Sequence, residues 1–304
     1  MASVSWPIRS ALFVPAHRRD WVGKALREQP DACVLDIEDS VPPENKPQAM
    51  ANLKAEIAEL LAADTGALVR INALYDGTPA EIEAAVADGL TAIVPPKVAH
   101  PDEIRRLADM LSYYEGRAGL ERGTVGICPL PETAEGMKFA YELAKASTRV
   151  RGIHGAVSGP VAADFSRAFG FKATMGGLEQ IYLGSKLVLD SRAAGAMYPI
   201  AGIFGVPTDD LAGTEALIRR AREYGYEGVA VMHPSHVAIA NRVFRPSAED
   251  VAYYKGMLEA FEAAEKAGLG AVKYHGSMID YAMLPQAREI LAEAARVASR
   301  GKRG

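Results

Sequence analysis

Eight short apolar segments recur along the chain, separated by segments with helical periodicity. They are rich in Val, Ile, Leu and Phe and comprise residues 11–15, 33–37, 68–71, 92–95, 125–128, 153–157, 200–204 and 229–232. Continuous apolar runs, rather than alternating ones, are typical of strands buried on both faces of a parallel sheet. This alternation of strands and helices predicts an α/β fold, namely a (β/α)8 TIM barrel.

The segments between the apolar runs have apolar residues at helical spacing. They are residues 49–61, 81–87, 102–111, 135–144, 181–194 and 214–224. A doubly wound open sheet is the competing architecture, and it would place a G-x-G-x-x-G turn after the first strand. That turn instead reads PAHRR at residues 15–19, which favours the barrel.

The chain continues well beyond the eighth apolar run. Residues 247–267 and 281–299 have helical patterns, and the sequence GLGAVKYHGSMID separates them. We expect a catalytic barrel in residues 1–245 and a C-terminal helical extension in residues 246–304. The apolar faces of this extension need a covering surface, which the barrel or an adjacent subunit would supply.

Charge and apolar patterning exclude several classes of protein. The chain has 34 basic and 38 acidic side chains and a net charge of −4, which excludes a strongly basic nucleic-acid binder. No apolar run reaches the roughly 20 residues of a membrane helix, and the first residues lack a signal-peptide core. Cys33 and Cys128 lie in apolar runs and provide no disulfide framework. We expect a cytoplasmic protein without a nucleic-acid or membrane partner.

Acidic residues predominate just after the predicted strands, where barrels collect their functional groups. The polar residues at these positions are Asp36, Glu38, Asp39, Arg70, Asn72, Lys97, Glu132, Asp164, Asp209, Asp210 and His233. Clustered carboxylates repel one another and are costly to bury unless a cation lies among them. A hard divalent ion, Mg²⁺ or Mn²⁺, would remove that cost, and Mg²⁺ commonly takes only one or two protein carboxylates.

A structural role is the alternative for each of these acids, because Asp and Glu after a strand often cap or begin a helix. This alternative stays open at this point for residues 36–39, which could also form salt bridges, and for Glu132 and Asp164. Arg70 differs because it interrupts a strand pattern. A cation near the depth of the barrel interior is costly without an anionic partner, so we interpret Arg70 as a site residue.

A series of motifs carries a family resemblance along nearly the whole chain. They are RSALFVPAHR (9–18), DACVLDIEDSVPPENK (31–46), LVRINAL (68–74), VPPKV (94–98), PETAEG (131–136), ADFSRAFGF (163–171), HPSHV (233–237), FRPSAEDV (244–251) and GSMID (276–280). With these motifs the chain resembles citrate lyase β-subunit-like proteins of the HpcH/HpaI aldolase group, and LDIEDSV and GSMID are the most specific segments. The resemblance implies a divalent-metal barrel with an extra C-terminal segment, assembled as a homotrimer or homohexamer.

The resemblance also implies an activity. It is the Mg²⁺-dependent cleavage or formation of a 3-hydroxyacyl-CoA of the malyl-CoA or citramalyl-CoA type, which yields acetyl-CoA and a 2-oxo acid. By position, Glu132 and Asp164 resemble the two metal ligands, and Arg70 resembles the arginine that faces the reacting oxygen. Asp36 and Glu38 resemble acids that surround the waters of the metal.

Two further groups of residues receive roles from the same resemblance. Asp280 resembles an aspartate that the tail of a neighbouring subunit brings to the active site, where it would transfer a proton. Arg18, Arg19 and Lys24 are candidates for binding the phosphates of CoA, and a solvated helix start is the alternative for them.

The sequence departs from the family pattern at three places. Ala16 replaces a usual Gly, Pro131 replaces a β-branched or apolar residue, and the loop SGPVAAD before Asp164 is longer than usual. An alignment without a gap in this loop would put Pro160 at the metal position, and the match of ADFSRAFGF favours Asp164. Three other functions stay open: a class II aldolase for free 4-hydroxy-2-oxo acids, an acyl-CoA thioesterase, and a non-catalytic acyl-CoA-binding subunit.

Overall fold

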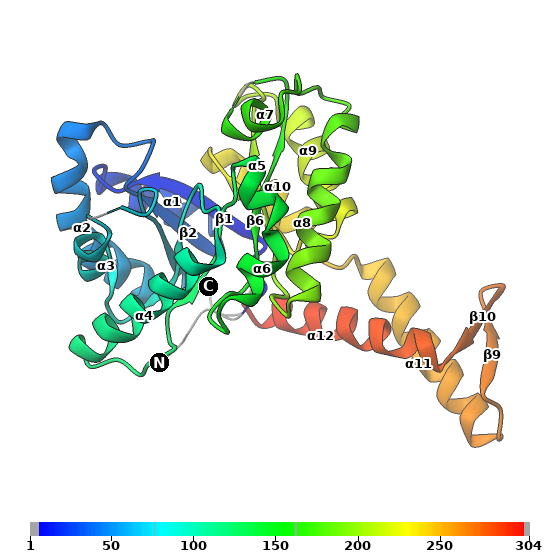
Figure 1. Ribbon diagram of the computed structural model, residues 1–304. Helices are drawn as coiled ribbons and strands as arrows, with labels where there is room; N and C mark the ends of the chain where they lie inside the picture. Colours follow the sequence, from blue (N-terminus) through cyan, green and yellow to red (C-terminus); the bar gives the residue numbers. More distant parts are fainter. Residues whose placement is uncertain (1–5, 76, 162, 301–304) are drawn as a thin grey trace. The chain divides into compact units, whose positions relative to one another are not determined.

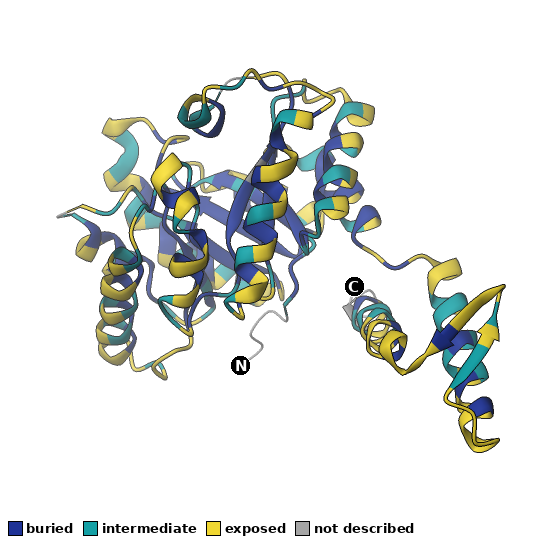
Figure 2. Cartoon of the chain, turned by 45° about the vertical axis from the view of Figure 1, so that its right-hand side comes forward, coloured by how far each residue is buried: buried dark blue, intermediate teal, exposed yellow. Residues whose placement is uncertain are grey.

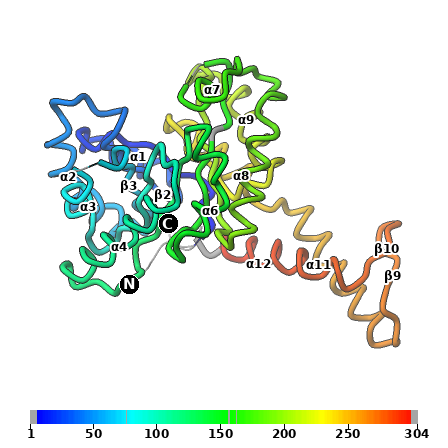
Figure 3. Tube along the Cα trace, viewed as in Figure 1, coloured from blue at the N-terminus to red at the C-terminus, as the bar shows by residue number. Residues whose placement is uncertain are grey.

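The structure is a computed structural model, and it describes residues 6–75, 77–161 and 163–300. The chain divides into two compact units, Met1–Arg242 and Val243–Gly304, whose course can be followed in Figure 3. None of the helices in the described part of the chain combines the length and apolar character needed to span a membrane.

A parallel eight-stranded sheet forms the centre of the first unit (Figure 1). Its strands are β1 (Ser10–Pro15), β2 (Ala32–Asp36), β3 (Gly66–Arg70), β4 (Leu90–Val94), β5 (Gly126–Ile127), β6 (His154–Ser158), β7 (Ile200–Phe204) and β8 (Gly228–Val231). The strand order is β5-β4-β3-β2-β1-β8-β7-β6, so the two end strands are consecutive in the chain. The His154 N–H donates to the Pro129 carbonyl across this junction at 2.8 Å. The curled sheet confirms the predicted TIM-barrel fold.

The helices of this unit lie around the sheet, with their exposed faces outward and the strands buried (Figure 2). They are α1 (Asp20–Arg27), α2 (Lys46–Ala62), α3 (Thr78–Ala85), α4 (Pro101–Arg117), α5 (Ala134–Lys138), α6 (Ala140–Lys145), α7 (Asp164–Phe169), α8 (Ile181–Ala193), α9 (Leu211–Tyr224) and α10 (Val237–Val243), with 3₁₀ turns at η1 (Pro43–Asn45), η2 (Leu178–Gln180) and η3 (Pro234–His236). The helix expected over residues 135–144 is divided in two, because the backbone at Phe139 leaves the helical region (φ −98°, ψ 21°).

Alternation along the strands places the polar residues of the site at one end of the barrel. Ala32 and Val34 of β2 and Leu68 of β3 belong to a buried apolar cluster of the sheet. Since side chains two residues apart on a strand share a face, Asp36 and Arg70 continue the same inward rows at the carboxyl ends of β2 and β3. The interior is therefore apolar below and charged at the end where barrel enzymes place their active sites.

The second unit has a core of its own. It consists of α11 (Ala248–Lys266), β9 (Ala271–Tyr274), β10 (Ser277–Asp280), η4 (Tyr281–Met283) and α12 (Leu284–Arg300). Met257, Phe261, Ile279, Leu284 and Ala287 are buried together in it. Ser247 caps α11 by accepting a hydrogen bond from the Asp250 N–H at 2.9 Å.

Two strands lie between the two long helices of this extension, where the sequence has the non-helical segment GLGAVKYHGSMID: β9 and β10 form an antiparallel hairpin. Tyr274 pairs with Ser277, so the turn contains only His275 and Gly276. Both turn residues have positive φ, 45° and 87°, as a two-residue hairpin turn of type I′ requires. The His-Gly pair in the segment between the helical patterns was the signal for this turn.

Candidate active site

Asp36 and Arg70 form a buried, bidentate salt bridge at the carboxyl end of the barrel. They are paired in the register of β2 and β3, and Arg70 Nε and Nη2 donate to the two Asp36 oxygens at 2.7 and 2.6 Å. Burial opposes ionisation of Asp36, but the hydrogen bonds from Arg70 and from the Ser40 hydroxyl outweigh it, so the pKa of this carboxyl is lowered. Asp36 also accepts from the Glu38 N–H, so the salt-bridging alternative applies to this residue.

Glu38 and Lys97 extend this charged network. Arg70 Nη1 lies 3.0 Å from Glu38 Oε2, and Lys97 Nζ lies 2.8 Å from Glu38 Oε1. Burial raises the pKa of Glu38, and Arg70 and Lys97 oppose that effect. An arginine carries five N–H donors, and the hydrogen bonds to Asp36 engage two of them, while Glu38 Oε2 lies close without accepting a hydrogen bond.

Glu132 carries a carboxylate that the protein does not neutralise. It follows β5, and the helix cap beside it is Thr133, whose hydroxyl accepts from the Gly136 N–H at 2.9 Å, so Glu132 itself does not cap α5. Among the described residues, no ion pair or hydrogen bond engages the Glu132 side chain. Burial, Glu38 and Asp164 raise its pKa to about 7, against the attraction of Arg70 and Lys97.

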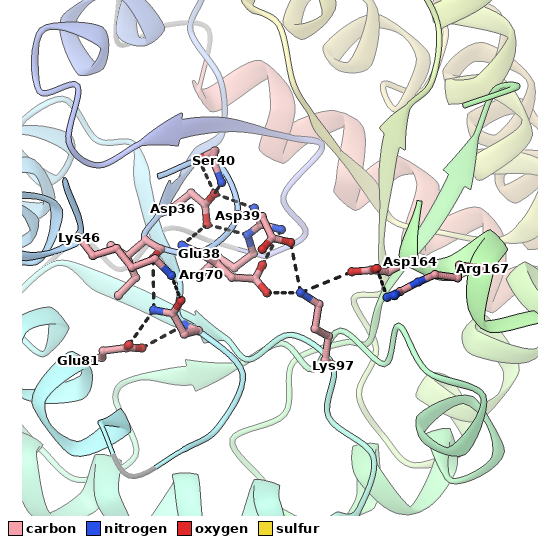
Figure 4. Close-up of polar contacts among 12 residues, drawn as sticks. Asp36, Glu38, Asp39, Ser40, Lys46, Arg70, Glu81, Lys97, Asp164 and Arg167 are labelled. Atoms are coloured by element: carbon pink, nitrogen blue, oxygen red, sulfur yellow. Dashed lines mark hydrogen bonds and ion pairs between the residues drawn. The ribbon is translucent and has the colours of Figure 1, made fainter. Parts of the chain in front are cut away.

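Asp164 lies after β6 and is the first residue of α7, so the helix-start alternative also describes its position. Its side chain nevertheless reaches the charged network, because Oδ2 lies 3.4 Å from Lys97 Nζ (Figure 4). The other oxygen, Oδ1, pairs with the exposed Arg167. The loop before it includes residue 162, which lies outside the described residues. The effect of Asp164 on the pKa of Glu132 places the two carboxylates within electrostatic range of each other.

These contacts define a carboxylate cluster, a name used below for Asp36, Glu38, Asp39, Glu132 and Asp164. Its five negative charges face three cations, Arg70, Lys97 and Arg167, so the group has a charge of −2 when all are ionised. One divalent cation would neutralise it, and oxygen ligands suit Mg²⁺ or Mn²⁺. No three His, Cys, Asp or Glu side chains of the described chain converge as a metal cage, so any bound ion needs water or substrate oxygens as well.

The three candidate residues for CoA phosphates lie at the start of α1. Arg18 and Lys24 both pair with Asp20, at 3.4 and 3.0 Å, and both lie over the Trp21 ring. Arg19 precedes α1 directly. All three cations are exposed. Exposure is compatible with phosphate binding and with a solvated helix start, so it does not distinguish the two interpretations.

Asp280 belongs to the second unit and ends β10. Its side chain is exposed and accepts a hydrogen bond from the Ala282 N–H at 2.9 Å, which caps η4. One of its carboxylate oxygens therefore has a structural role, and the other is free to act elsewhere.

Sequence reasoning missed the contribution of Lys97 and of a polar group beside the cluster. Asn72 Nδ2 donates to Glu81 Oε1 at 2.7 Å, and the side-chain oxygen Oδ1 of Asn72 accepts from Lys46 Nζ. The Tyr75 hydroxyl donates to the same Glu81 oxygen at 2.8 Å. The signal for Lys97 was its place directly after the fourth apolar run, which the preponderance of acids obscured.

The chain is similar to known proteins along most of its length. Residues 9–234 match the model of the HpcH/HpaI aldolase/citrate lyase family. The chain belongs to this family. It is 33% identical over 299 residues to a citrate lyase subunit beta-like protein of Deinococcus radiodurans, covering 95% of this chain and 98% of the relative. An L-malyl-CoA/beta-methylmalyl-CoA lyase of Cereibacter sphaeroides is 32% identical over 315 residues, covering 96% of each.

A solved structure of the family has the same fold. The CitE protein of Mycobacterium tuberculosis, in complex with magnesium, acetoacetate and coenzyme A, superposes with a TM-score of 0.70 at 25% identity. The match covers 94% of this chain and 97% of that one. The family therefore extends over both units described here.

Proposed function

We propose that the protein is a Mg²⁺-dependent carbon–carbon lyase that cleaves or forms a 3-hydroxyacyl-CoA of the malyl-CoA or citramalyl-CoA type. The observation that carries this proposal is the unneutralised Glu132 carboxylate, which lies within electrostatic range of Asp164, Arg70 and Lys97 in a barrel of the aldolase/citrate lyase family. The names of the malyl-CoA lyase relative and of the CitE complex with magnesium and coenzyme A support the same chemistry.

Glu132 and Asp164 are the side chains that would hold the ion. Bound there, Mg²⁺ acts as a Lewis acid for the oxygens of the substrate. Both carboxylates follow strands at the carboxyl end of the barrel, and Glu38 and Lys97 surround them. Asp36 is committed to Arg70 and Ser40, so its part is to orient the arginine rather than to bind the ion.

Arg70 stabilises the charge that develops during cleavage. The hydroxyl loses its proton and becomes the carbonyl of the 2-oxo acid as the bond between its carbon and the carbon next to the thioester breaks, so negative charge moves to the thioester oxygen. The Arg70 N–H groups that do not bind Asp36 supply donors for that oxygen. Because Asp36 holds the guanidinium in one orientation, little reorganisation is needed as the charge appears.

Asp280 would transfer the proton at the carbon of the acetyl group, as an acid in cleavage and as a base in synthesis. We propose that the second unit brings it to the barrel of a neighbouring subunit in a homotrimer or homohexamer. The exposed Asp280 carboxylate and the hairpin that carries it support this role. Arg18, Arg19 and Lys24 would bind the CoA phosphates, with Trp21 between two of them.

A cytoplasmic location completes the proposal. Cys33 and Cys128 are both free and buried, and burial raises the pKa of each thiol to about 12. Neither has the thiolate character of a reactive cysteine.

The decisive experiment offers purified protein with Mg²⁺ a panel of 3-hydroxyacyl-CoA thioesters and free 4-hydroxy-2-oxo acids, with products identified by mass spectrometry. The proposal predicts acetyl-CoA and a 2-oxo acid from one or more thioesters, and no reaction after treatment with EDTA. Release of pyruvate from free acids, with the thioesters left intact, would instead identify a class II aldolase. Free CoA with an intact carbon skeleton would identify a thioesterase, and no turnover at all would indicate a binding subunit.

A further inference from the structure

Lys97 is held in an unusual backbone conformation beside the candidate metal ligands. Its φ of 56° lies in the left-handed region, which is unfavourable for a residue with a Cβ. The Lys97 N–H donates to the Leu130 carbonyl at 2.8 Å, and Gly136 packs so closely that a Cβ there would lie 2.2 Å from the Val98 carbonyl. The ends of β4 and β5 therefore fix the position from which this side chain extends.

The Lys97 ammonium contacts three carboxylates of the cluster. Its Nζ lies 2.8 Å from Glu38, 3.2 Å from Asp39 and 3.4 Å from Asp164 (Figure 4). An ammonium has three N–H donors, so each donor has a carboxylate to meet. Burial opposes the charge of Lys97, but Glu38 and Asp39 outweigh it and raise the pKa of this ammonium, so the side chain stays a cation.

The contacts of this cation are unequal. The two shorter ones join Lys97 to the loop after β2, and the longest one reaches Asp164, a proposed metal ligand. Glu132, the other proposed ligand, has no ion pair among the described residues, and Lys97 acts on it only through longer-range electrostatic attraction. The group keeps a charge of −2 with Lys97 already counted, so the ammonium does not replace the divalent ion, and one of its contacts is with a proposed ligand of that ion.

We propose that Lys97 is a resident counter-ion that holds the carboxylate cluster together without metal and competes with the divalent cation for Asp164. It thereby sets the metal affinity of the site. This inference rests on the proposed function, in which Glu132 and Asp164 bind Mg²⁺. Entry of the divalent ion displaces Asp164 from the ammonium, which keeps its two shorter contacts and repels the new cation.

The experiment measures binding of Mn²⁺ to the metal-free, full-length protein by electron paramagnetic resonance, without substrate. Lys97→Met should lower the Kd for Mn²⁺ about tenfold, because an ammonium near the ion no longer repels it. Lys97→Gly removes the same charge and relieves the left-handed backbone, so any loss of stability in this variant comes from the missing ammonium and not from backbone strain. Lys97→Arg keeps the charge and should bind Mn²⁺ like the unsubstituted protein.

Lys186→Met is the matched control, since Lys186 pairs with Asp190 on its own helix α8, outside the carboxylate cluster. The Kd of this variant for Mn²⁺ should equal that of the unsubstituted protein. A second readout is the thermal midpoint of the metal-free protein, which Lys97→Met should lower while Mn²⁺ restores it. Equal or weaker Mn²⁺ binding by both Lys97→Met and Lys97→Gly would overturn this inference and leave the proposed function intact. Failure of the unsubstituted protein to bind Mn²⁺ would overturn both.

Discussion

Asp36 and Arg70 occupy paired positions on neighbouring strands and share two hydrogen bonds of 2.7 and 2.6 Å at the carboxyl end of the barrel. A second bidentate pair lies at the opposite end, where Arg9 precedes β1 and Asp31 precedes β2, with distances of 2.9 and 2.8 Å. Both pairs tie adjacent strands together, but only the first faces the carboxylate cluster. The two pairs therefore allow structural and functional contributions to be separated.

Asp36→Asn should destabilise the protein and reduce turnover. It leaves the buried Arg70 guanidinium without its main partner, which typically costs about 3–5 kcal/mol, and it releases the orientation of the donor groups. We expect kcat to fall on the order of a hundredfold, as misplacement of a catalytic group commonly causes. Asp31→Asn should cost similar stability in urea unfolding with kcat preserved. An equal loss of kcat in both variants would contradict an orienting role for Asp36.

Glu132→Gln should abolish Mg²⁺-dependent turnover while the circular dichroism spectrum stays unchanged. The side chain makes no ion pair in the described structure, so its replacement removes a metal ligand without breaking a structural contact. The unsubstituted protein should lose the same activity in EDTA and regain it when Mg²⁺ or Mn²⁺ is added. Turnover that persists in EDTA would eliminate the metal role of Glu132.

Divalent-ion binding should strengthen as the pH rises to about 7 and then level off. The pKa of Glu132 is raised to about 7 by burial, Glu38 and Asp164, so below that pH the metal-free carboxyl holds a proton that the ion must displace. Titration calorimetry in two buffers of different ionisation enthalpy should show about one proton released at pH 6 and almost none at pH 8.5. Proton release that is the same at both pH values would contradict this assignment.

Much of the barrel could be predicted from the sequence because each strand is a short, continuous run of apolar residues. Buried parallel strands need apolar residues on both faces, so eight such runs indicated the sheet and its order without any contact information. The hairpin of the second unit was less visible. Its strands, such as AVKY in β9, are short and partly exposed, and only the His275-Gly276 pair indicated the turn.

The site was predictable in its residue types and less so in its contacts. Position after a strand indicated a larger set of polar candidates, from which the family resemblance singled out Asp36, Glu132 and Asp164, while the strand pattern itself singled out Arg70. Their partners depend on register and loop geometry, which no pattern encodes, so the pairing of Asp36 with Arg70 became visible only in the structure. Lys97 was hidden for the same reason, because its importance comes from a left-handed backbone and from carboxylates of two distant loops.

Glu56 on α2 should make the protein less stable as the pH rises. Both of its carboxylate oxygens are buried without a hydrogen-bond partner in the described structure. Burial and Glu59 raise its pKa from the ordinary 4.5 to about 8, against the attraction of Arg19. Between these values the folded protein holds a proton that the unfolded chain releases, so the stability present below pH 4.5 is lost progressively up to about pH 8.

Glu56→Met keeps the volume of this side chain and removes its charge. We expect it to raise the free energy of unfolding by up to about 5 kcal/mol at pH 9 and by little at pH 4. The control is Glu83→Met, which removes an exposed carboxylate paired with Arg117 and should shift stability by less than about 0.5 kcal/mol at either pH. Urea unfolding at the two pH values measures both variants, and a pH-independent effect of Glu56→Met would contradict the assignment.

A site shared between subunits predicts complementation between two inactive variants. Arg70→Ala lacks the donor on the barrel, and Asp280→Ala lacks the proton-transfer group on the second unit, so each should be inactive alone. When equal amounts are unfolded and assembled together, each site draws its barrel and its tail at random, and about a quarter of the sites receive both native residues. Mixing Arg70→Ala with the double variant provides the control and should restore nothing. If the mixture of single variants also stays inactive while it assembles normally, Asp280 does not act across subunits.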